Sequence, residues 1–240
     1  MFSYKFYIST INLFLENNYR FLSFKSQEYS EKKIIYLRHD VDNTDIRSVL
    51  NLAKIDNMCN VNSIFFFQPN AELYNMFSKE CMAIIERVVE MGHEIGLHID
   101  ASIFSSIEEL GNYINNTYNY YSLYFPLTNI ISYHRPASFI LNSDITIEGY
   151  INVYQEKFFK RIKYFSDSNR REFWKQKDFL SSIENNDSIQ FLTHPAWWSE
   201  KEMSAHDVFL NYSKELEQYK DDVLSNNVGV FKKIISGEIK

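Results

Sequence analysis

Short apolar runs of strand length alternate along this chain with longer segments that repeat apolar residues at helical spacing. This alternation is typical of an α/β fold in which helices connect the strands of a mostly parallel sheet. The expected strands lie near residues 34–37, 63–67, 94–99, 129–134, 151–155, 162–166 and 189–194. The expected helices cover residues 45–58, 79–92, 105–121 and 204–224, with a short piece at 228–236.

Glycine, serine and proline residues indicate some helix ends, and their small number argues against a flexible domain boundary. Gly92 is expected to stop the second helix, and Ser105 or Ser106 to cap the third. The chain has only 4 Pro and 6 Gly, and it contains no Gly/Ser/Pro-rich linker and no internal repeat. We therefore expect residues 1–240 to form a single domain.

The composition is that of an ordinary soluble globular protein, with 45% hydrophobic and 23% charged residues. A formal net charge of −6 argues against nucleic-acid binding, which normally needs a basic surface. Aromatic residues reach 17%, which fits core packing and also a carbohydrate-facing cleft, with core packing the more common use.

Several features favour a cytoplasmic location. No window reaches the ~20 apolar residues of a membrane span. The N-terminal stretch has neither a continuous apolar region nor a small-residue cleavage site, so we predict no signal peptide. Cys59 and Cys81 lack metal-ligand spacing, and a reduced pair is expected in preference to a disulfide.

Four of the predicted strands end on stretches that contain histidine. These stretches are LRHDVD (37–42), GHEIGLHID (92–100), YHRPAS (133–138) and FLTHPAWW (191–198). Functional groups of parallel α/β folds gather at the carboxyl ends of the strands. We therefore expect the four stretches to converge on one cleft.

The first stretch places Asp40 and Asp42 on the same side of an extended chain, because side chains alternate with a period of two. Two neighbouring carboxylates resist joint ionisation unless a cation or an arginine lies between them. A divalent metal would make one carboxylate a ligand and leave the other as a base. The alternative is that Asp42 or Asn43 caps the helix that starts near Asp45.

The second stretch offers His93, His98 and Asp100. His93 directly follows a helix-ending glycine, so a structural, hydrogen-bonded role is favoured. His98 and Asp100 share one side at the end of the strand. Imidazole and carboxylate together are the ligands of catalytic zinc sites that keep a position open for water.

The last two stretches add an arginine, a histidine and two tryptophans. Pro136 favours an extended backbone at Arg135, whose guanidinium could hold a catalytic aspartate through a paired hydrogen bond. A surface arginine is the alternative. His194 is suited to general acid chemistry. Of the adjacent Trp197 and Trp198, we expect one to belong to the core and the other to be able to stack on a sugar ring.

Taken together, these motifs resemble, in order, those of the polysaccharide deacetylase (NodB-homology) superfamily. LRHDVD is similar to its first motif, GHEIGLH to its second, HRPAS to its arginine–proline motif and FLTH to its late histidine motif. The resemblance covers about residues 10 to 200. It is closest to a subgroup with a late HP-x-WW that is associated with bacterial O-antigen and surface-polysaccharide synthesis.

The resemblance implies a deformed (β/α)7 barrel and metal-assisted removal of an N-acetyl group from an amino sugar. By position, Asp40 would be the general base, Arg135 would orient it, and His194 would protonate the leaving amine. Asp42 and His98 would bind the metal, for which zinc best fits the His/Asp ligands. The expected substrate is a nucleotide- or lipid-linked sugar.

Two positions depart from the family pattern. Val41 separates aspartates that are usually adjacent, so a shifted register would make His39 the base and Asp40 the ligand. Ser102 stands where the family has a second metal histidine. Asp100 could replace that histidine, His194 could be recruited, or the site could hold no metal.

The remaining candidates are substrate-binding residues, namely His39, His134, Trp197 and Asp167. For Asp167, a position in a solvated charged loop is the more common alternative. The alternatives to a deacetylase are a metal-free hydrolase of amides or ureides, favoured by Ser102, and a non-catalytic carbohydrate-binding protein. The joint presence of Asp40, Arg135 and His194 argues against the last of these.

Overall fold

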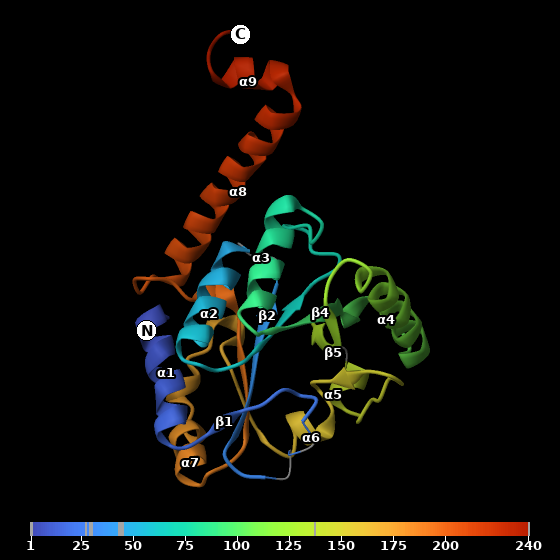
Figure 1. The fold of residues 1–240 in the computed structure, drawn as a ribbon, viewed down its shortest axis with the longest axis vertical. Helices are drawn as coiled ribbons and strands as arrows, with labels where there is room; N and C mark the ends of the chain where they lie inside the picture. The colour runs from blue at the N-terminus through green and yellow to red at the C-terminus, as the bar shows by residue number, and fades with distance from the viewer. Residues whose placement is uncertain (1, 27, 29–30, 43–45, 137, 240) are drawn as a thin grey trace. The chain divides into compact units, whose positions relative to one another are not determined.

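The computed structural model describes residues 2–26, 28, 31–42, 46–136 and 138–239, and its centre is a parallel β-sheet (Figure 1). The strands follow one another in the order β6-β5-β4-β3-β2-β8-β7, and β1 pairs with β2. Every strand pair of this sheet is parallel. The strands are β1 (Arg20–Phe21), β2 (Ile34–Val41), β3 (Ile64–Phe67), β4 (Glu94–Asp100), β5 (Leu127–His134), β6 (Ile151–Asn152), β7 (Lys163–Ser166) and β8 (Ile189–Thr193).

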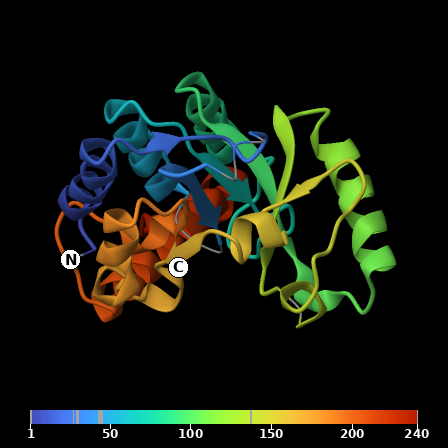
Figure 2. The same cartoon turned by 90° about the horizontal axis from the view of Figure 1, so that it is seen from below.

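The chain divides into two compact units, Met1–Glu202 and Met203–Lys240. The first unit contains the sheet with α1 (Tyr4–Glu16), α2 (Arg47–Met58), α3 (Lys79–Glu90), α4 (Ile107–Tyr121), α5 (Ser138–Leu141), α6 (Glu156–Phe159) and α7 (Asp178–Glu184). Its 3-10 turns are η1 (Ala101–Ile103), η2 (Ser168–Arg170), η3 (Phe173–Lys175) and η4 (Pro195–Trp197). The sheet and its surrounding helices form a (β/α)7-type half-barrel, as expected (Figure 2).

Strand β2 has buried side chains on both of its faces, which is typical of a parallel sheet covered on two sides. Ile35 and Leu37 belong to the hydrophobic cluster that α1, α2, α3 and α7 share with the sheet. Tyr36 belongs to a second cluster, which includes Phe66 of β3. Because side chains along a strand alternate between its two faces, β2 has one face toward the helices and one toward the inside of the half-barrel.

Helix α4 and strands β4 and β5 contribute to the second cluster. Leu110 and Ile114 of α4 are its buried residues, and they belong to the same cluster as Leu97 and Ile99 of β4. In Figures 1 and 2 the helices α1 to α4 lie around the outside of the strands. The inward face of β2 carries the buried polar side chains of Arg38 and Asp40 beside apolar residues of the second cluster.

All seven predicted strands exist, but the first one is longer than expected. It continues through Arg38, His39 and Asp40, so most of LRHDVD lies within a buried strand and not after it. The polar residues of this segment extend the strand because β8 pairs with β2 as far as His39 and β3 pairs with it from Arg38 to Val41.

The long predicted helices are also present. Gly92, with a φ of 88°, follows α3, and the Ser106 side chain accepts a hydrogen bond at the start of α4. Helix α2 starts at Arg47, while the predicted start at residue 45 and the capping residue Asn43 lie outside the described residues. Helices α1, α5, α6 and α7 were not expected from the sequence pattern.

The second unit consists of α8 (Ala205–Asn227) and α9 (Gly229–Ile235), close to the predicted ranges. The Ser204 side chain caps α8 by accepting from the backbone N–H of Asp207. The organisation of residues 1–240 as a single domain remains a prediction. None of the described helices combines the length and apolar character that crossing a membrane requires.

Candidate metal and acid–base site

Polar side chains from β2, β4 and β5 meet at the carboxyl ends of these strands. The register of β4 and β5 pairs His98 with Ser132 and Asp100 with His134. His98 Nε2 lies 3.0 Å from Asp42 Oδ1 and 3.7 Å from Asp40 Oδ2. The expected convergence is therefore observed, and the two aspartates do face the same side.

Asp42, His98 and His134 form a group that could hold a metal ion. His98 Nε2 and His134 Nδ1 each lie 3.0 Å from Asp42 Oδ1, and the three ligand atoms are within 4.8 Å of one another. Burial raises the pKa of Asp42, but hydrogen bonds from His134 and His98 lower it well below its usual value. An ionised carboxylate and two imidazoles suit a divalent cation such as zinc, with positions left for water.

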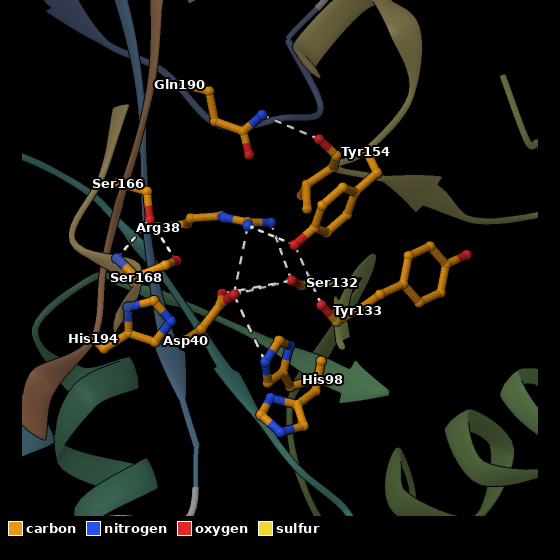
Figure 3. A network of polar contacts seen from close by, with 12 residues as sticks. Arg38, Asp40, His98, Ser132, Tyr133, Tyr154, Ser166, Ser168, Gln190 and His194 are labelled. Atoms are coloured by element: carbon orange, nitrogen blue, oxygen red, sulfur yellow. Dashed lines mark hydrogen bonds and ion pairs between the residues drawn. The ribbon is translucent and has the colours of Figure 1, made fainter. Parts of the chain in front are cut away.

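Asp40 lies beside this group and is almost completely buried. Its closest cationic neighbour is Arg38, whose Nη2 is 3.5 Å from Asp40 Oδ2 (Figure 3). Arg38 Nη1 donates to Ser132 Oγ over 3.0 Å, and the Ser132 hydroxyl is 3.3 Å from Asp40 Oδ2. Arg38 Nη2 also donates to the hydroxyl of Tyr154. Asp40 is thus held from the inside of the half-barrel.

His194 also lies near Asp42, with its Nε2 3.7 Å from Asp42 Oδ2. Its Nδ1 lies 2.6 Å from Oδ1 of Asp167, a fully buried carboxylate that also accepts from the Trp198 indole over 2.8 Å. Burial lowers the pKa of His194, but the charge and the hydrogen bond of Asp167, together with the charges of Asp42 and Asp40, raise it to about 9. The imidazole is therefore protonated at neutral pH and has a proton to donate.

Asp100 and Arg135 bind each other instead of joining the group around Asp42. The Arg135 guanidinium pairs with Asp100 Oδ2, while Oδ1 accepts from the backbone and hydroxyl of Ser102. Burial raises the pKa of Asp100, and these hydrogen bonds lower it below its usual value. Among the residues that the structure describes, the metal-binding group has His134 where Asp100 was expected.

The backbone at Arg135 also differs from the expectation. The prediction of an extended conformation before Pro136 is wrong, because the φ of Arg135 is 48°. This turn follows directly after β5, and the side chain that it carries is 64% exposed and reaches Asp100.

His39 points to the opposite face of β2, where it belongs to a buried polar network. Its Nδ1 is 2.7 Å from Thr193 Oγ1, and its Nε2 is 2.8 Å from Asp56 Oδ2. Asp56 also accepts from the hydroxyls of Tyr7 and Ser63. The register in which Asp40 faces Asp42 leaves His39 on the helix side, away from the group around Asp42.

Four further candidate residues are buried or partly buried. His93 Nε2 lies 2.9 Å from the carbonyl oxygen of Ala53, which confirms its hydrogen-bonded role. Trp198 is buried and Trp197 is partly buried against the same hydrophobic cluster. Asp167 is fully buried, so the interpretation as a solvated loop residue is wrong.

Sequence reasoning gave no role to Arg38, Ser132 and Tyr154, and it treated His134 only as a pocket residue. One signal was present for Arg38, because a residue two positions before Asp40 must share its face of the strand. For Ser132, Tyr154 and His134 the necessary information is the register between strands, which spacing along the chain does not provide.

The fold defines the class of proteins to which this chain is similar. No protein-family model matches the sequence, and no curated protein matches it. The similarity that is found is one of fold, to solved structures of carbohydrate deacetylases.

One of these structures is the chitin deacetylase from the fungal pathogen Colletotrichum lindemuthianum. It has a TM-score of 0.50 and 14% identity, over 78% of this chain and 84% of that chain. Another is the catalytic domain of the peptidoglycan N-acetylglucosamine deacetylase from Eubacterium rectale, with a TM-score of 0.46 and 18% identity over 79% and 84% of the two chains. The first of these establishes that the half-barrel is shared.

Proposed function

We propose that this protein is a metal-dependent hydrolase that removes an N-acetyl or similar acyl group from an amino sugar. The observation that carries the proposal is the group Asp42, His98 and His134, with Asp40 3.7 Å from His98 and His194 3.7 Å from Asp42. A metal-binding group with a further carboxylate and a protonated imidazole beside it is suited to the hydrolysis of an amide. The motif resemblance and the shared fold support the same activity.

In this proposal Asp42, His98 and His134 hold a divalent cation, for which zinc fits the donor atoms best. When bound, such a cation lowers the pKa of water and polarises the amide carbonyl. Asp40 accepts the proton of the attacking water. His194 then donates its proton to the nitrogen of the departing amine, and Asp167 holds the imidazole in place for this transfer.

The substrate that we propose is an amino-sugar precursor of a bacterial surface polysaccharide, such as the O-antigen, linked to a nucleotide or a lipid. The closer likeness of LRHDVD and HPAWW to the subgroup associated with these polymers supports this assignment. Cys59 and Cys81 are both free, which suits the reducing cytoplasm, and we propose that location.

The first test is the metal content of protein purified without a chelator or a histidine tag. We expect near-stoichiometric metal in the wild type and its loss in His98→Ala and in His134→Ala. Asp100→Asn should retain the metal, because Ser102 and Arg135 occupy the Asp100 oxygens. His206→Ala, which changes an exposed histidine of α8, is the matched control. A wild type that stays metal-free after zinc addition would contradict the proposal.

The second test is the release of acetate from acetamido sugars, namely free N-acetylglucosamine, its oligomers, and nucleotide-linked N-acetylhexosamines. We expect release from at least one of them in the presence of metal and none after removal of the metal with a chelator. Binding of these sugars without turnover would instead indicate a carbohydrate-binding protein. Turnover that persists without metal would indicate a metal-free amide hydrolase.

A further inference from the structure

The guanidinium group that faces Asp40 belongs to Arg38, a residue of the same strand. Arg38 is two residues before Asp40 in β2, so both side chains point into the half-barrel (Figure 3). Arg38 is fully buried and its Nη2 is 3.5 Å from Asp40 Oδ2. Arg135, in contrast, is largely exposed and binds Asp100.

Arg38 is itself fixed by β5 and by the turn that follows β6. Its Nη1 donates to Ser132 of β5, and its Nη2 donates to the Tyr154 hydroxyl, which in turn donates to the carbonyl oxygen of Tyr133. The guanidinium carbon also lies 5.0 Å from the centre of the Tyr154 ring. A planar guanidinium with several fixed partners has a defined orientation. Because Arg38 contacts Asp40, it also fixes the orientation of the Asp40 carboxylate.

Ser132 adds a second link between the same two residues. Its hydroxyl accepts from Arg38 and can donate to either oxygen of Asp40, at 3.3 and 3.5 Å. Asp40 is therefore bound from the inside of the half-barrel by a cation and by a hydroxyl. A buried carboxylate needs such partners, because an unpaired charge in the interior is strongly destabilising.

The position of Asp40 matters because it could also reach the metal-binding group. Asp40 Oδ2 is 3.7 Å from His98 Nε2, the atom that also contacts Asp42. A divalent cation held by His98 would attract this carboxylate and could take it as one more ligand. The contacts with Arg38 and Ser132 oppose that movement.

We infer that Arg38, assisted by Ser132, is a positioning residue that holds Asp40 outside the coordination of the metal and so keeps it available as the base. This inference rests on the proposed function, and it assigns to Arg38 the task that the motif resemblance assigns to Arg135. Removing Arg38 should therefore have two opposite effects, a slower reaction and tighter metal binding.

The experiment compares Arg38→Met, Arg38→Lys, Arg135→Met and the double variant Arg38→Met/Asp40→Asn with the wild type. Zn²⁺ binding to chelator-stripped protein is measured by calorimetry, and acetate release is measured on the acetamido sugar that the wild type hydrolyses best. Arg161→Met, which removes an exposed arginine far along the chain, is the matched control. Circular dichroism establishes that each variant is folded.

We expect Arg38→Met to lower kcat by roughly 10- to 100-fold, the usual effect of losing a partner of a metal site. Its Kd for Zn²⁺ should fall by roughly tenfold, because the released Asp40 carboxylate is attracted to the cation and becomes a ligand. The double variant should return the Kd to near the wild-type value. Arg38→Lys should recover part of kcat, and Arg135→Met should not tighten Zn²⁺ binding.

An unchanged Kd and kcat in folded Arg38→Met would overturn the inference, and so would tight Zn²⁺ binding that persists in the double variant. If Arg38→Met does not fold, Ser132→Ala takes its place, since it removes one contact of Asp40 and leaves the charge pair intact. Ser132→Ala should also lower the Kd for Zn²⁺, by a smaller factor than Arg38→Met. An unchanged Kd would overturn the inference. A wild type that neither binds Zn²⁺ nor releases acetate would contradict the proposed function and this inference with it.

Discussion

Asp167 determines the properties of His194 more than any other charged residue does. Its carboxylate receives the His194 imidazole, the backbone N–H of the same residue and the Trp198 indole. Three donors therefore contact this one buried carboxylate, and the hydrogen bond to Nδ1 fixes the direction of the His194 imidazole. The pKa of about 9 for His194 is a consequence of this arrangement.

The raised pKa of His194 predicts how stability depends on pH. A histidine with a folded-state pKa near 9, above its ordinary value of 6.5, stabilises the fold in its protonated form. This contribution is complete below pH 6.5 and disappears as the pH rises toward 9. We expect urea unfolding of chelator-treated protein to show a loss on the order of 1–3 kcal/mol over this range.

His194→Gln provides the comparison for this measurement, because it retains a polar side chain but does not titrate. The difference in unfolding free energy between the wild type and His194→Gln should shrink as the pH rises from 6.5 to 9. A difference that stays constant with pH would show that His194 is not charged in the folded protein at neutral pH.

Asp40 gives a second prediction for a single residue. Asp40→Asn removes the proposed base but leaves Asp42, His98 and His134 in place. We expect kcat for acetate release to fall by roughly 10²- to 10⁴-fold, which is the usual contribution of a general base. Metal content, measured by mass spectrometry on the same preparation, should stay near that of the wild type. Loss of the metal together with activity would make Asp40 a ligand.

Strand β4 shows how closely the strands that carry the site approach one another. A Cβ added at Gly96 would lie 2.6 Å from Phe66 Cε1 and 2.7 Å from the carbonyl oxygen of Ile130. The second of these atoms is backbone of the neighbouring strand and cannot turn away. Because Gly96 precedes His98 on the same inward face, the close approach of β4 and β5 also determines where that imidazole lies.

We therefore expect Gly96→Ala to destabilise the fold by roughly 1–3 kcal/mol through overpacking. Gly111→Ala is a matched control. Gly111 lies in helix α4, and the nearest atom to its added Cβ, Cγ2 of Ile147, is 3.9 Å away. That substitution should leave stability unchanged or raise it by about 0.5–1 kcal/mol. Thermal unfolding of the two variants measures both effects, and equal stability of the two would contradict the crowding at Gly96.

The existence of each strand could be predicted from the sequence more easily than where the strand ends and what its side chains contact. The apolar run before LRHDVD predicts β2, but the buried polar residues that lengthen it to Val41 look like loop residues in the sequence. They are tolerated because partners from distant segments, such as Ser132 and Asp56, satisfy them. Helix α7 was missed because its seven residues are too few for a clear helical period.

At the scale of the whole molecule, every residue of the candidate site belongs to the first unit, Met1–Glu202. The buried residues of both hydrophobic clusters also come from this unit, the last of them being Trp198. Helix α8 contains no buried residue. The site and its core are therefore assembled without a buried side chain from residues 203–239.

We predict that a chain ending at Glu202 folds and binds metal as the full chain does. The measurements are metal content and the midpoint of thermal unfolding, with the full-length protein as the reference. Failure of the shortened chain to fold or to hold metal would instead favour the prediction that residues 1–240 form one domain.

The sequence was also sufficient to predict that distant segments converge, but not which of their side chains become neighbours. His98 and Asp100 look equivalent along the chain, since both are polar residues on the inward side of β4. The pairing of β4 with β5 brings His134 to Asp42, and Arg135 and Ser102 bind Asp100. This outcome depends on the register of two strands about thirty residues apart, which the order of residues does not reveal.

The two faces of β2 have a consequence for how such a sequence can evolve. His39 belongs to a network on the helix side of β2. Its neighbours in the chain, Arg38 and Asp40, pair with each other inside the half-barrel. A single-residue insertion or deletion within this stretch would exchange the two sets and disrupt both at once. Substitutions can be compensated one at a time, but a change of length cannot. Among descendants of a common ancestor, the number of residues here should be preserved even where their identities have drifted.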